Sequence, residues 1–443
     1  MMTRTANERT AKPLCADADE PPKETYDRRF DPYRIPRTER ARKLVRQNVQ
    51  HIETLEEMLE LRARKRKAAD RPTFEATVGA IVCDVVHRHL TAPGKWLAIQ
   101  LSNRVLGCSG RYRSRVMGQT LPDVVERLSM PQLGCIEVRK GTRRAFGPAK
   151  ATTIRIGRHL KRWIEEEGFE LSDFGRSGTE ELIILKRPKE GHWDLGARIN
   201  YEETPDTERY RAEMRRINLW LAKGDISFDE AYEEEEVVDP SDRTLRRVFN
   251  RDFQRGGRLF GGFWLPLSKE QRFNGIAING EGIAELDFGQ MAARLAYARA
   301  GAIPPPGDLY AVPGVNLSRE GARDGVKAVL NAMLYSSQPL TRFPPNSRKG
   351  LRGSFEGVAK AVRKHHASIE HLFFKGIGME TMFMESEILV EVLLGCEKLG
   401  IVALPIHDAI LVQQSASKEA RGLMLEAFFK HTGLEGQVDV VPS

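Results

Sequence analysis

Several features that would fix a functional class are missing from this 443-residue sequence. The five cysteines include no CxxC pair: Cys15, Cys83, Cys108, Cys135 and Cys396. This spacing argues against a zinc ribbon and a disulfide framework, and it suits a reducing cytoplasm. No stretch approaches the roughly 18 apolar residues of a membrane helix, and the first residues lack the apolar run of a signal peptide. We therefore expect a cytoplasmic protein that does not enter a membrane.

The charge balance is basic. Lys and Arg number 69 against 61 Asp and Glu, which gives a net charge of +8, while 41% of the residues are hydrophobic. A chain of this length and composition can bury the cores of two or three domains. Because a basic excess attracts polyanions, it favours nucleic acid as a partner.

The N-terminal part divides into an arm and a domain. Residues 1–37 are polar and interrupted by prolines, so we expect a disordered basic arm. Residues 38–190 are expected to form one domain, beginning with a helix over residues 38–68. Basic residues cluster at both ends of this helix, which is typical of either a solvated surface helix or a DNA contact.

Further along this domain, helical and strand patterns follow one another. Apolar periodicity predicts helices over Phe74–Leu90, Trp96–Leu106 and Pro122–Leu128, and alternation predicts strands at Gly134–Arg139 and Thr152–Ile156. The loop between the two strands is basic, and we expect Arg143, Arg144 and Lys150 to bind DNA. Three helices followed by a basic hairpin resemble a winged helix-turn-helix. A structural accessory domain is the alternative.

The remaining chain divides into a polar stretch and a segment rich in motifs. Residues 191–242 predict a connector with a helix over Glu208–Ala222, and residues 243–443 should hold the chemistry. The sequence shows no convincing second group of clustered carboxylates of the kind that a proofreading exonuclease needs. We therefore expect an activity without proofreading.

Two aspartates in the C-terminal segment fall at the ends of expected strands. Asp287 ends a strand over Glu285–Phe288, and Asp408 lies between strands at Ile401–Pro405 and Ile410–Val412. A tight hairpin would expose Asp408 at its tip. Two carboxylates on adjacent strands can bind Mg²⁺, because hard cations demand oxygen ligands. Taken alone, either aspartate would be interpreted as a turn or capping residue.

Between the aspartates lies an expected helix over Arg323–Tyr335. Arg323, Lys327, Asn331 and Tyr335 recur every four residues and share one face. The two cations can reach a triphosphate, and the tyrosine would meet the sugar and base. The alternative is an amphipathic helix with two surface cations. The flanking aspartates favour the nucleotide-binding interpretation.

In order and spacing, these elements resemble motifs A, B and C of family A DNA polymerases and of their relatives, the single-subunit phage-type RNA polymerases. Gly257-Arg258-Leu259 is similar to the family's primer-contacting segment, and residues 376–394 fall where the family has a helix lining the template–primer cleft. The stretch Leu404-Pro405-Ile406-His407-Asp408 resembles compact replicases of plasmids and mobile elements. The resemblance covers roughly residues 243–430.

The resemblance implies an α+β fold: a right-hand palm with an antiparallel sheet and helical fingers, preceded by a mainly helical, winged-helix-like domain. Asp287, Asp408 and the carbonyl of Phe288 would hold two Mg²⁺ ions, for which Mn²⁺ can substitute. The implied partners are a DNA primer-template and dNTPs, with rNTPs as the alternative, and no protein partner is indicated. The implied nucleotide-binding residues are Arg323, Lys327, Asn331, Tyr335 and Gln290, and the implied primer or template contacts are Arg258, His407 and Arg294.

Some positions depart from the DNA polymerase pattern. Ala292 stands where those enzymes usually have a Glu that blocks a ribose 2′-hydroxyl, and Ala409 where they often have Glu. Asn331 replaces an aromatic residue and Ser336 a glycine. The leading interpretation is a compact DNA polymerase of a plasmid, phage or mobile element. A primase or RNA polymerase is the second. A DNA-binding initiator with an inactive palm is the third, and the intact Asp287 and Asp408 count against it.

Overall fold

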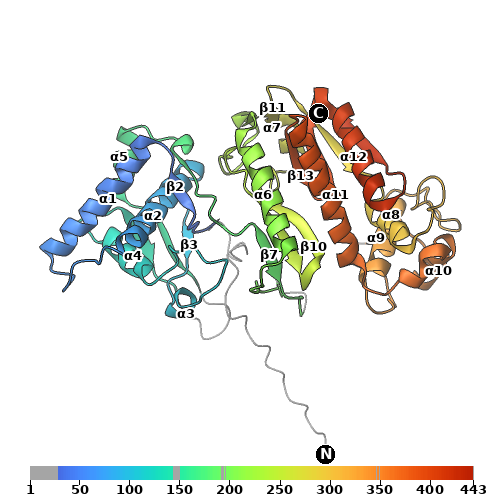
Figure 1. Cartoon of the computed structure of the whole chain (residues 1–443), viewed down its shortest axis with the longest axis horizontal. Helices are drawn as coiled ribbons and strands as arrows, with labels where there is room; N and C mark the ends of the chain where they lie inside the picture. The colour runs from blue at the N-terminus through green and yellow to red at the C-terminus, as the bar shows by residue number, and fades with distance from the viewer. Residues whose placement is uncertain are drawn as a thin grey trace, which may run out of the picture. The chain divides into compact units, whose positions relative to one another are not determined.

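The chain folds into two units, each with its own core (Figure 1). The computed structural model describes residues 28–142, 150–190, 194, 196–345, 347–348 and 350–442. Unit 1 comprises Met1–Glu181, Arg187–Asn200 and Glu234–Asp242, and unit 2 comprises Leu182–Lys186, Tyr201–Glu233 and Arg243–Ser443. The stretch expected to connect two domains is thus divided between them. The expected arm up to residue 27 lies outside the described residues.

Unit 1 consists of helices and short strands. In chain order these are β1 (Arg28–Arg29), β2 (Arg34–Pro36), α1 (Glu39–Met58), α2 (Arg71–Thr91), β3 (Leu97–Ile99), α3 (Asn103–Leu106), α4 (Thr120–Ser129), β4 (Ile136–Arg139), β5 (Thr152–Ile156), α5 (Arg158–Glu166), η1 (Leu171–Asp173) and β6 (Phe174–Arg176). β1 and β2 fall within the expected arm, whose last residues are therefore ordered strands.

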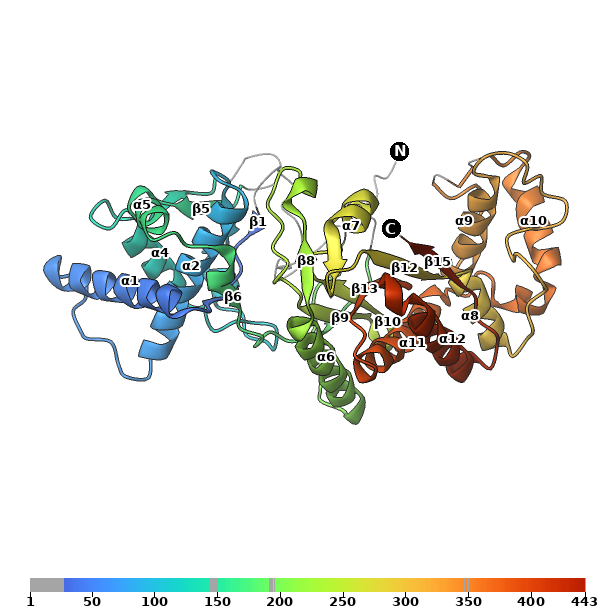
Figure 2. The ribbon, with the colours of Figure 1, turned by 90° about the horizontal axis from the view of Figure 1, so that it is seen from above.

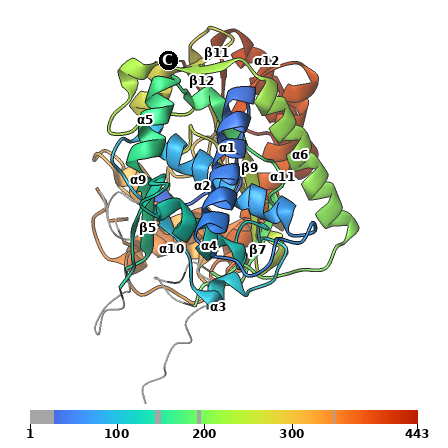
Figure 3. The same ribbon diagram turned by 90° about the vertical axis from the view of Figure 1, so that its left-hand side faces the viewer.

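Helix α1 begins at an N-cap, where the Thr38 hydroxyl accepts a hydrogen bond from the backbone N–H of Ala41 at 3.2 Å. Its apolar face packs on α2, in front of which it lies in Figure 3. The helix ends at Met58, ten residues before the expected end. Arg66 folds back instead, pairing with Glu56 at 2.8 Å and stacking 3.5 Å from the Phe74 ring centroid. These contacts are more favourable than continuing the helix through a run of like charges.

The helix expected over Trp96–Leu106 was wrong. The structure has strand β3 there, followed by the short helix α3. β3 pairs in parallel with β1 and antiparallel with β5, so that the sheet order is β1-β3-β5-β4. Hydrogen bonds to two distant strands override the local helical period, which short apolar runs define poorly.

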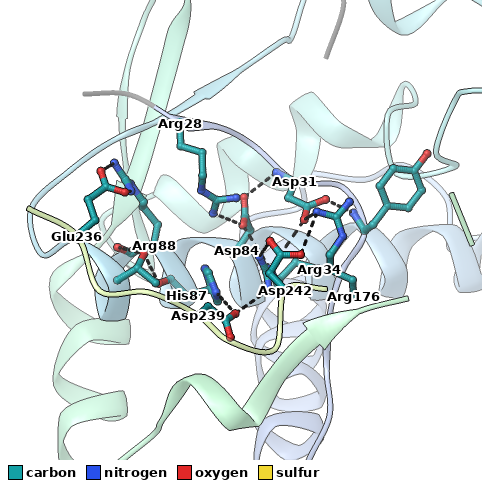
Figure 4. Close-up of polar contacts among 12 residues, drawn as sticks. Arg28, Asp31, Arg34, Asp84, His87, Arg88, Arg176, Glu236, Asp239 and Asp242 are labelled. Atoms are coloured by element: carbon teal, nitrogen blue, oxygen red, sulfur yellow. Dashed lines mark hydrogen bonds and ion pairs between the residues drawn. The ribbon is translucent and has the colours of Figure 1, made fainter. Parts of the chain in front are cut away.

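A network of buried ion pairs lies beside the apolar core of unit 1 (Figure 4). Asp84 on α2 is fully buried, and it accepts hydrogen bonds from Arg28 at 2.6 Å and from the backbone N–H of Asp31 at 2.7 Å. Arg34, which is 1% exposed, lies 3.9 Å from Asp84. The network thereby joins β1 and β2 to α2. Its charged members are Arg28, Asp31, Arg34, Asp84, Arg88, Arg176, Glu180, Glu236, Asp239 and Asp242.

The same network holds the Glu234–Asp242 segment on unit 1. Glu236 receives two hydrogen bonds from Arg88, at 2.8 and 2.9 Å, and Asp239 lies 2.8 Å from the His87 Nε2. Burial of Asp239 opposes its ionisation. Hydrogen bonds from His87 and Ser241 outweigh that cost and lower the pKa of Asp239 to about 2.

Unit 2 contains more and longer elements. These are β7 (Ile183–Lys186), α6 (Pro205–Lys223), β8 (Ile226–Phe228), η2 (Glu230–Tyr232), β9 (Leu245–Asn250), β10 (Asp252–Gly261), α7 (Lys269–Gly275), β11 (Ile276–Ile278), β12 (Ile283–Phe288), α8 (Met291–Ala300), α9 (Ala322–Tyr335), α10 (Phe355–His365), η3 (Ala367–Leu372), α11 (Gly378–Lys398), β13 (Ala403–Ile406), β14 (Ala409–Gln413), η4 (Gln414–Ala416), α12 (Ser417–Thr432) and β15 (Val438–Pro442).

The central sheet of unit 2 is antiparallel, with the strand order β13-β14-β12-β15. Helices α11 and α12 pack side by side against it (Figure 2). A second apolar cluster joins α8, α9 and α10. The expectation of a mixed α+β fold is thus confirmed. Among the described residues, no helix has both the length and the apolar character needed to cross a membrane.

Replacing Asp84 with Ala should destabilise unit 1 strongly, because the buried Arg34 and the half-buried Arg28 would lose their shared carboxylate. Removing one partner of a buried ion pair costs about 3–5 kcal/mol. Hydrogen exchange of α2 peptides together with urea unfolding would measure the loss. The control is Glu39→Ala, which removes an exposed pair with Arg46 and should change little. Equal effects of the two substitutions would contradict a structural role for the network.

Candidate active site

A two-residue turn carries Asp408. Strands β13 and β14 pair antiparallel up to Ile406 and Ala409, which leaves His407 and Asp408 as the turn. His407 has a φ of 55°, a left-handed conformation that glycine usually supplies in such turns. The Trp264 indole N–H anchors the hairpin by donating to the Pro405 carbonyl oxygen at 2.9 Å. Strained backbone of this kind persists only where its surroundings enforce it.

Strand pairing brings Asp287 to this turn. In the β12–β14 ladder Asp287 is the partner of Ala409, the neighbour of Asp408. The backbone N–H of Phe288 donates to the Asp408 carbonyl oxygen at 3.3 Å. The two aspartates, 121 positions apart in sequence, therefore end on adjacent strands, and both side chains are half-buried.

The two carboxylates repel each other. Burial is the largest cause that raises the pKa of Asp287 to about 7, and the charge of Asp408 adds to it. Lys327 acts in the opposite direction, which places helix α9 within electrostatic reach of the pair. Without a cation, Asp287 is therefore partly protonated near pH 7.

Helix α9 presents the expected polar face. Arg323, Lys327 and Tyr335 are exposed and Asn331 is half-buried, while the apolar residues between them enter the core. Asn331 Oδ1 is buried and has no hydrogen-bond partner among the described residues. Arg323 is already engaged, because its Nε and Nη2 donate to the Asp308 carboxylate at 2.6 and 3.1 Å.

Arg258 and Tyr335 belong to a second cluster, together with a residue that the sequence did not single out. Arg258 on β10 donates two hydrogen bonds, at 2.7 and 3.1 Å, to Glu385 on α11, which is only 4% exposed. Burial lowers the pKa of His407, and the charge of Arg258 lowers it further. The Tyr335 ring lies on Gly378, where an added Cβ would come within 2.3 Å of a ring atom.

Gln290 and Arg294 contact the segment leading into β15. Gln290, buried with a φ of 60°, donates to Gln437 Oε1 at 3.2 Å and accepts from the Leu309 N–H at 3.2 Å. Arg294 donates to the Glu435 carbonyl oxygen at 3.1 Å. Gly289 allows this approach, because a Cβ there would lie 2.9 Å from the Gln437 side chain.

Sequence reasoning missed four residues near the aspartates: Glu385, Asp308, Gln437 and Asp439. Asp439 is the cross-strand partner of Asp287 in the β12–β15 pair, so the two side chains point to the same face of the sheet. Alternation within Val438–Pro442 could have indicated a strand, but not its partner. Helix α11 covers most of residues 376–394, where the resemblance places a helix that lines the cleft. Three other acids of this helix are paired within the chain, Glu380 with Arg255, Glu387 with Arg247, and Glu391 with Lys430 and His431.

The donor set around Asp287 and Asp408 suits a hard divalent cation. The available atoms are carboxylate and carbonyl oxygens, which are the ligands that such a cation prefers. Burial, with the charge of Asp408 added to it, raises the pKa of Asp287, and a bound cation would favour the ionised form instead. No group of three or more His, Cys, Asp or Glu residues with metal-binding geometry occurs among the described residues. Such a cation would therefore rely on the two aspartates, a backbone carbonyl and oxygens from outside the chain.

The expected DNA-binding loop is covered only in part. Lys150 is exposed, and its backbone N–H donates to the Thr142 carbonyl oxygen at 3.0 Å. Arg143 and Arg144 lie outside the described residues. Their role in binding DNA stays a prediction.

No protein-family model matches the sequence, and no curated protein does. Among solved structures, the chain is similar to the polymerase domain of Pol1 from M. smegmatis in complex with DNA primer-template and dNTP. The identity is 14% and the TM-score 0.30, over 53% of this chain and 50% of that one. The match therefore spans half the length of that domain, and a TM-score of 0.30 does not establish a shared fold.

The raised pKa of Asp287 predicts a pH-dependent stability. The unfolded chain releases this proton near pH 4, whereas the folded protein holds it up to about pH 7. The stabilisation from the protonated form is thus complete below about pH 4 and is lost as the pH rises through 7. Asp287→Asn should therefore melt above the wild type at about pH 8 in EDTA, and near it at about pH 4.

Thermal melts of the two proteins at both pH values test this, with the exposed Asp225→Asn as the control. Added Mg²⁺ should raise the wild-type melting temperature at the higher pH and leave Asp287→Asn nearly unchanged. If wild type and Asp287→Asn melted alike at the higher pH, the raised pKa of Asp287 would be refuted.

Proposed function

We propose that unit 2 performs template-directed nucleotidyl transfer, as a compact DNA polymerase that extends a primer without proofreading. One observation carries the proposal: two carboxylates from distant segments meet on one sheet, within electrostatic reach of a cation on α9. A structural role alone would not require a pair that raises the pKa of Asp287 to about 7. We also propose that unit 2 has the palm-and-fingers arrangement of such a polymerase.

Asp287, Asp408 and the carbonyl of Phe288 would hold Mg²⁺, with Mn²⁺ able to substitute. When bound, paired divalent ions supply an activated 3′-hydroxyl and stabilise the departing pyrophosphate. The protein itself holds the two carboxylates side by side through the β12–β14 ladder. The Trp264 anchor holds the hairpin that carries Asp408, which limits the movement of this carboxylate.

Lys327 and Arg323 would bind the phosphates of the incoming nucleotide, and Asn331, Tyr335 and Gln290 would surround its sugar and base. The unsatisfied Oδ1 of Asn331 supports this assignment, because a buried acceptor without a partner is costly. Arg323 would have to exchange Asp308 for phosphate. Arg258, His407 and Arg294 would contact the primer or template strand.

Two alanines favour a second candidate, a primase or RNA polymerase that uses rNTPs. Ala292 on α8 is half-buried one turn beyond Phe288, and Ala409 is buried opposite Asp287. Neither side chain can block a ribose 2′-hydroxyl or add a carboxylate to the site. Selectivity against ribose would therefore depend on other residues, such as Tyr335 or Asn331.

For unit 1 we propose a winged-helix arrangement. Support comes from the element order α2, β3, α3, α4, β4, β5 and from the strand order β3-β5-β4. Helix α4 takes the place of the helix that enters the major groove in such designs. It exposes Asp123 and Glu126, and Arg127 is paired with Glu126 and Glu56. An acidic helix is poorly suited to the phosphates that flank a groove.

Asp287→Ala and Asp408→Ala should each slow primer extension by about 10³-fold or more, because each removes a cation ligand. A labelled primer–template with Mg²⁺ and dNTPs measures the rate, and an unprimed template tests priming. Affinity for primer–template and the circular dichroism spectrum should stay near wild type. The control Asp225→Asn should extend normally. Extension at the wild-type rate by either alanine variant would refute the proposal.

Ala292→Glu should sharpen the preference for dNTPs by about 10- to 100-fold, because a carboxylate would crowd and desolvate a 2′-hydroxyl. The ratio of kcat/KM values for a dNTP and its rNTP measures this preference. Ala292→Gln, similar in size and uncharged, separates crowding from charge. A wild-type enzyme that prefers rNTPs and starts chains without a primer would instead identify a primase.

A further inference from the structure

The four-stranded sheet of unit 1 packs one face into the apolar core. Its opposite face has a different amino-acid composition. Leu97, Ile136 and Ile154 are buried against the helices. Side chains alternate along strands, so the intervening positions point to the other face. The register aligns Ala98 with Thr153, Thr153 with Arg139, and Glu137 with Arg155. By the same alternation Trp96 falls on the face of Ala98.

Two guanidinium groups gather at Trp96 on this face. The Cζ atoms of Arg139 and Arg155 lie 3.9 and 4.5 Å from the indole centroid. The ring is consequently only 8% exposed. Arg155 also pairs with Glu137, at 2.9 and 2.6 Å. The Arg139 side chain is exposed, and it makes no hydrogen bond or ion pair with the described residues.

A guanidinium that stacks on an aromatic ring keeps its N–H donors directed outward along its own plane. Two of them beside one ring concentrate positive charge and planar surface in one place. Phosphate oxygens match the donors, and a nucleobase matches the planar surface. Lys140 and Lys150, exposed at the end of the same hairpin, extend the positive charge. A single nucleic-acid strand offers both chemistries, whereas a duplex keeps its bases inside its own stack.

We propose that this surface, formed by Trp96, Arg139, Thr153 and Arg155 and here named the tryptophan face, binds a single strand of nucleic acid. The acidic surface of α4 makes the alternative, docking of unit 1 in a major groove, unfavourable. The proposal is independent of nucleotidyl transfer in unit 2, because it concerns binding without nucleotide or metal.

Fluorescence anisotropy of the full chain with labelled oligo(dT) of about 20 nucleotides, in EDTA and without nucleotide, tests the tryptophan face. Arg139→Ala should raise the dissociation constant about tenfold and reduce the log–log salt slope by about 0.7, the value for one phosphate contact on a single strand. Arg139→Lys keeps the charge but not the planar stack, so it should restore the salt slope and only part of the affinity.

The matched control is Arg162→Ala, an arginine of α5 in the same unit whose side chain is 73% exposed. It should bind oligo(dT) within about twofold of wild type. Trp96 is buried, so Trp96→Leu is compared with Trp96→Phe, which keeps a ring for the guanidiniums. The phenylalanine variant should retain most of the affinity, and circular dichroism melts confirm the folding of both.

A duplex of the same length should bind more weakly than oligo(dT), and the Arg139→Ala variant should lose less affinity for it. Equal binding of oligo(rU) and oligo(dT) would support a strand site that is indifferent to the sugar. Wild-type affinity of Arg139→Ala for oligo(dT), or a preference for the duplex, would overturn the proposal. Extension at saturating primer–template should be normal in Arg139→Ala, which separates this site from the chemistry of unit 2.

Discussion

The pairing of β12 with β14 is the constraint on which the candidate site depends. It joins strands 121 positions apart in sequence, measured between the two aspartates, and it fixes two negative charges next to each other. Burial and the charge of Asp408 together raise the pKa of Asp287 to about 7, so ionisation of Asp287 opposes the fold as the pH rises toward neutral. A register shift of one residue would turn Asp287 to the opposite face of the sheet. The alternation of buried and half-buried residues along the second half of β12 opposes such a shift, because it would turn Leu286 out of the core.

Local patterns in the sequence predicted the elements that carry the site. The four-residue spacing from Arg323 to Tyr335 predicted α9 and its polar face, and the alternation around Asp287 predicted β12. The hairpin at Asp408 could also be predicted from the sequence, because apolar runs flank two polar residues. In each case the signal lies within about 15 residues, the range over which periodicity is informative.

The features that could not be predicted from the sequence depend on contacts between segments that are far apart in the chain. Glu385 lies within residues 376–394, the segment expected to line a cleft, yet only the fold brings it to Arg258. Gln437 and Asp439 reach the site because β15 joins the sheet beside β12, a pairing that no local pattern encodes. The error over Trp96–Leu106 has the same origin. β3 exists because of β1 and β5, and it positions Trp96 for Arg139 and Arg155.

The surroundings of the carboxylates differ between the two units. In unit 1 the buried carboxylates Asp84 and Asp239 have guanidinium or imidazole partners within the chain. In unit 2 Asp287 and Asp408 face each other, and Asn331 Oδ1 lacks a partner among the described residues. The positive φ angles of Gln290 and His407 add backbone strain at the same place. Unpaired buried groups and backbone strain that gather at one place are expected where a bound ligand compensates for them. In unit 2 that point lies at the ends of β12 and β13, where a cation would supply the missing positive charge.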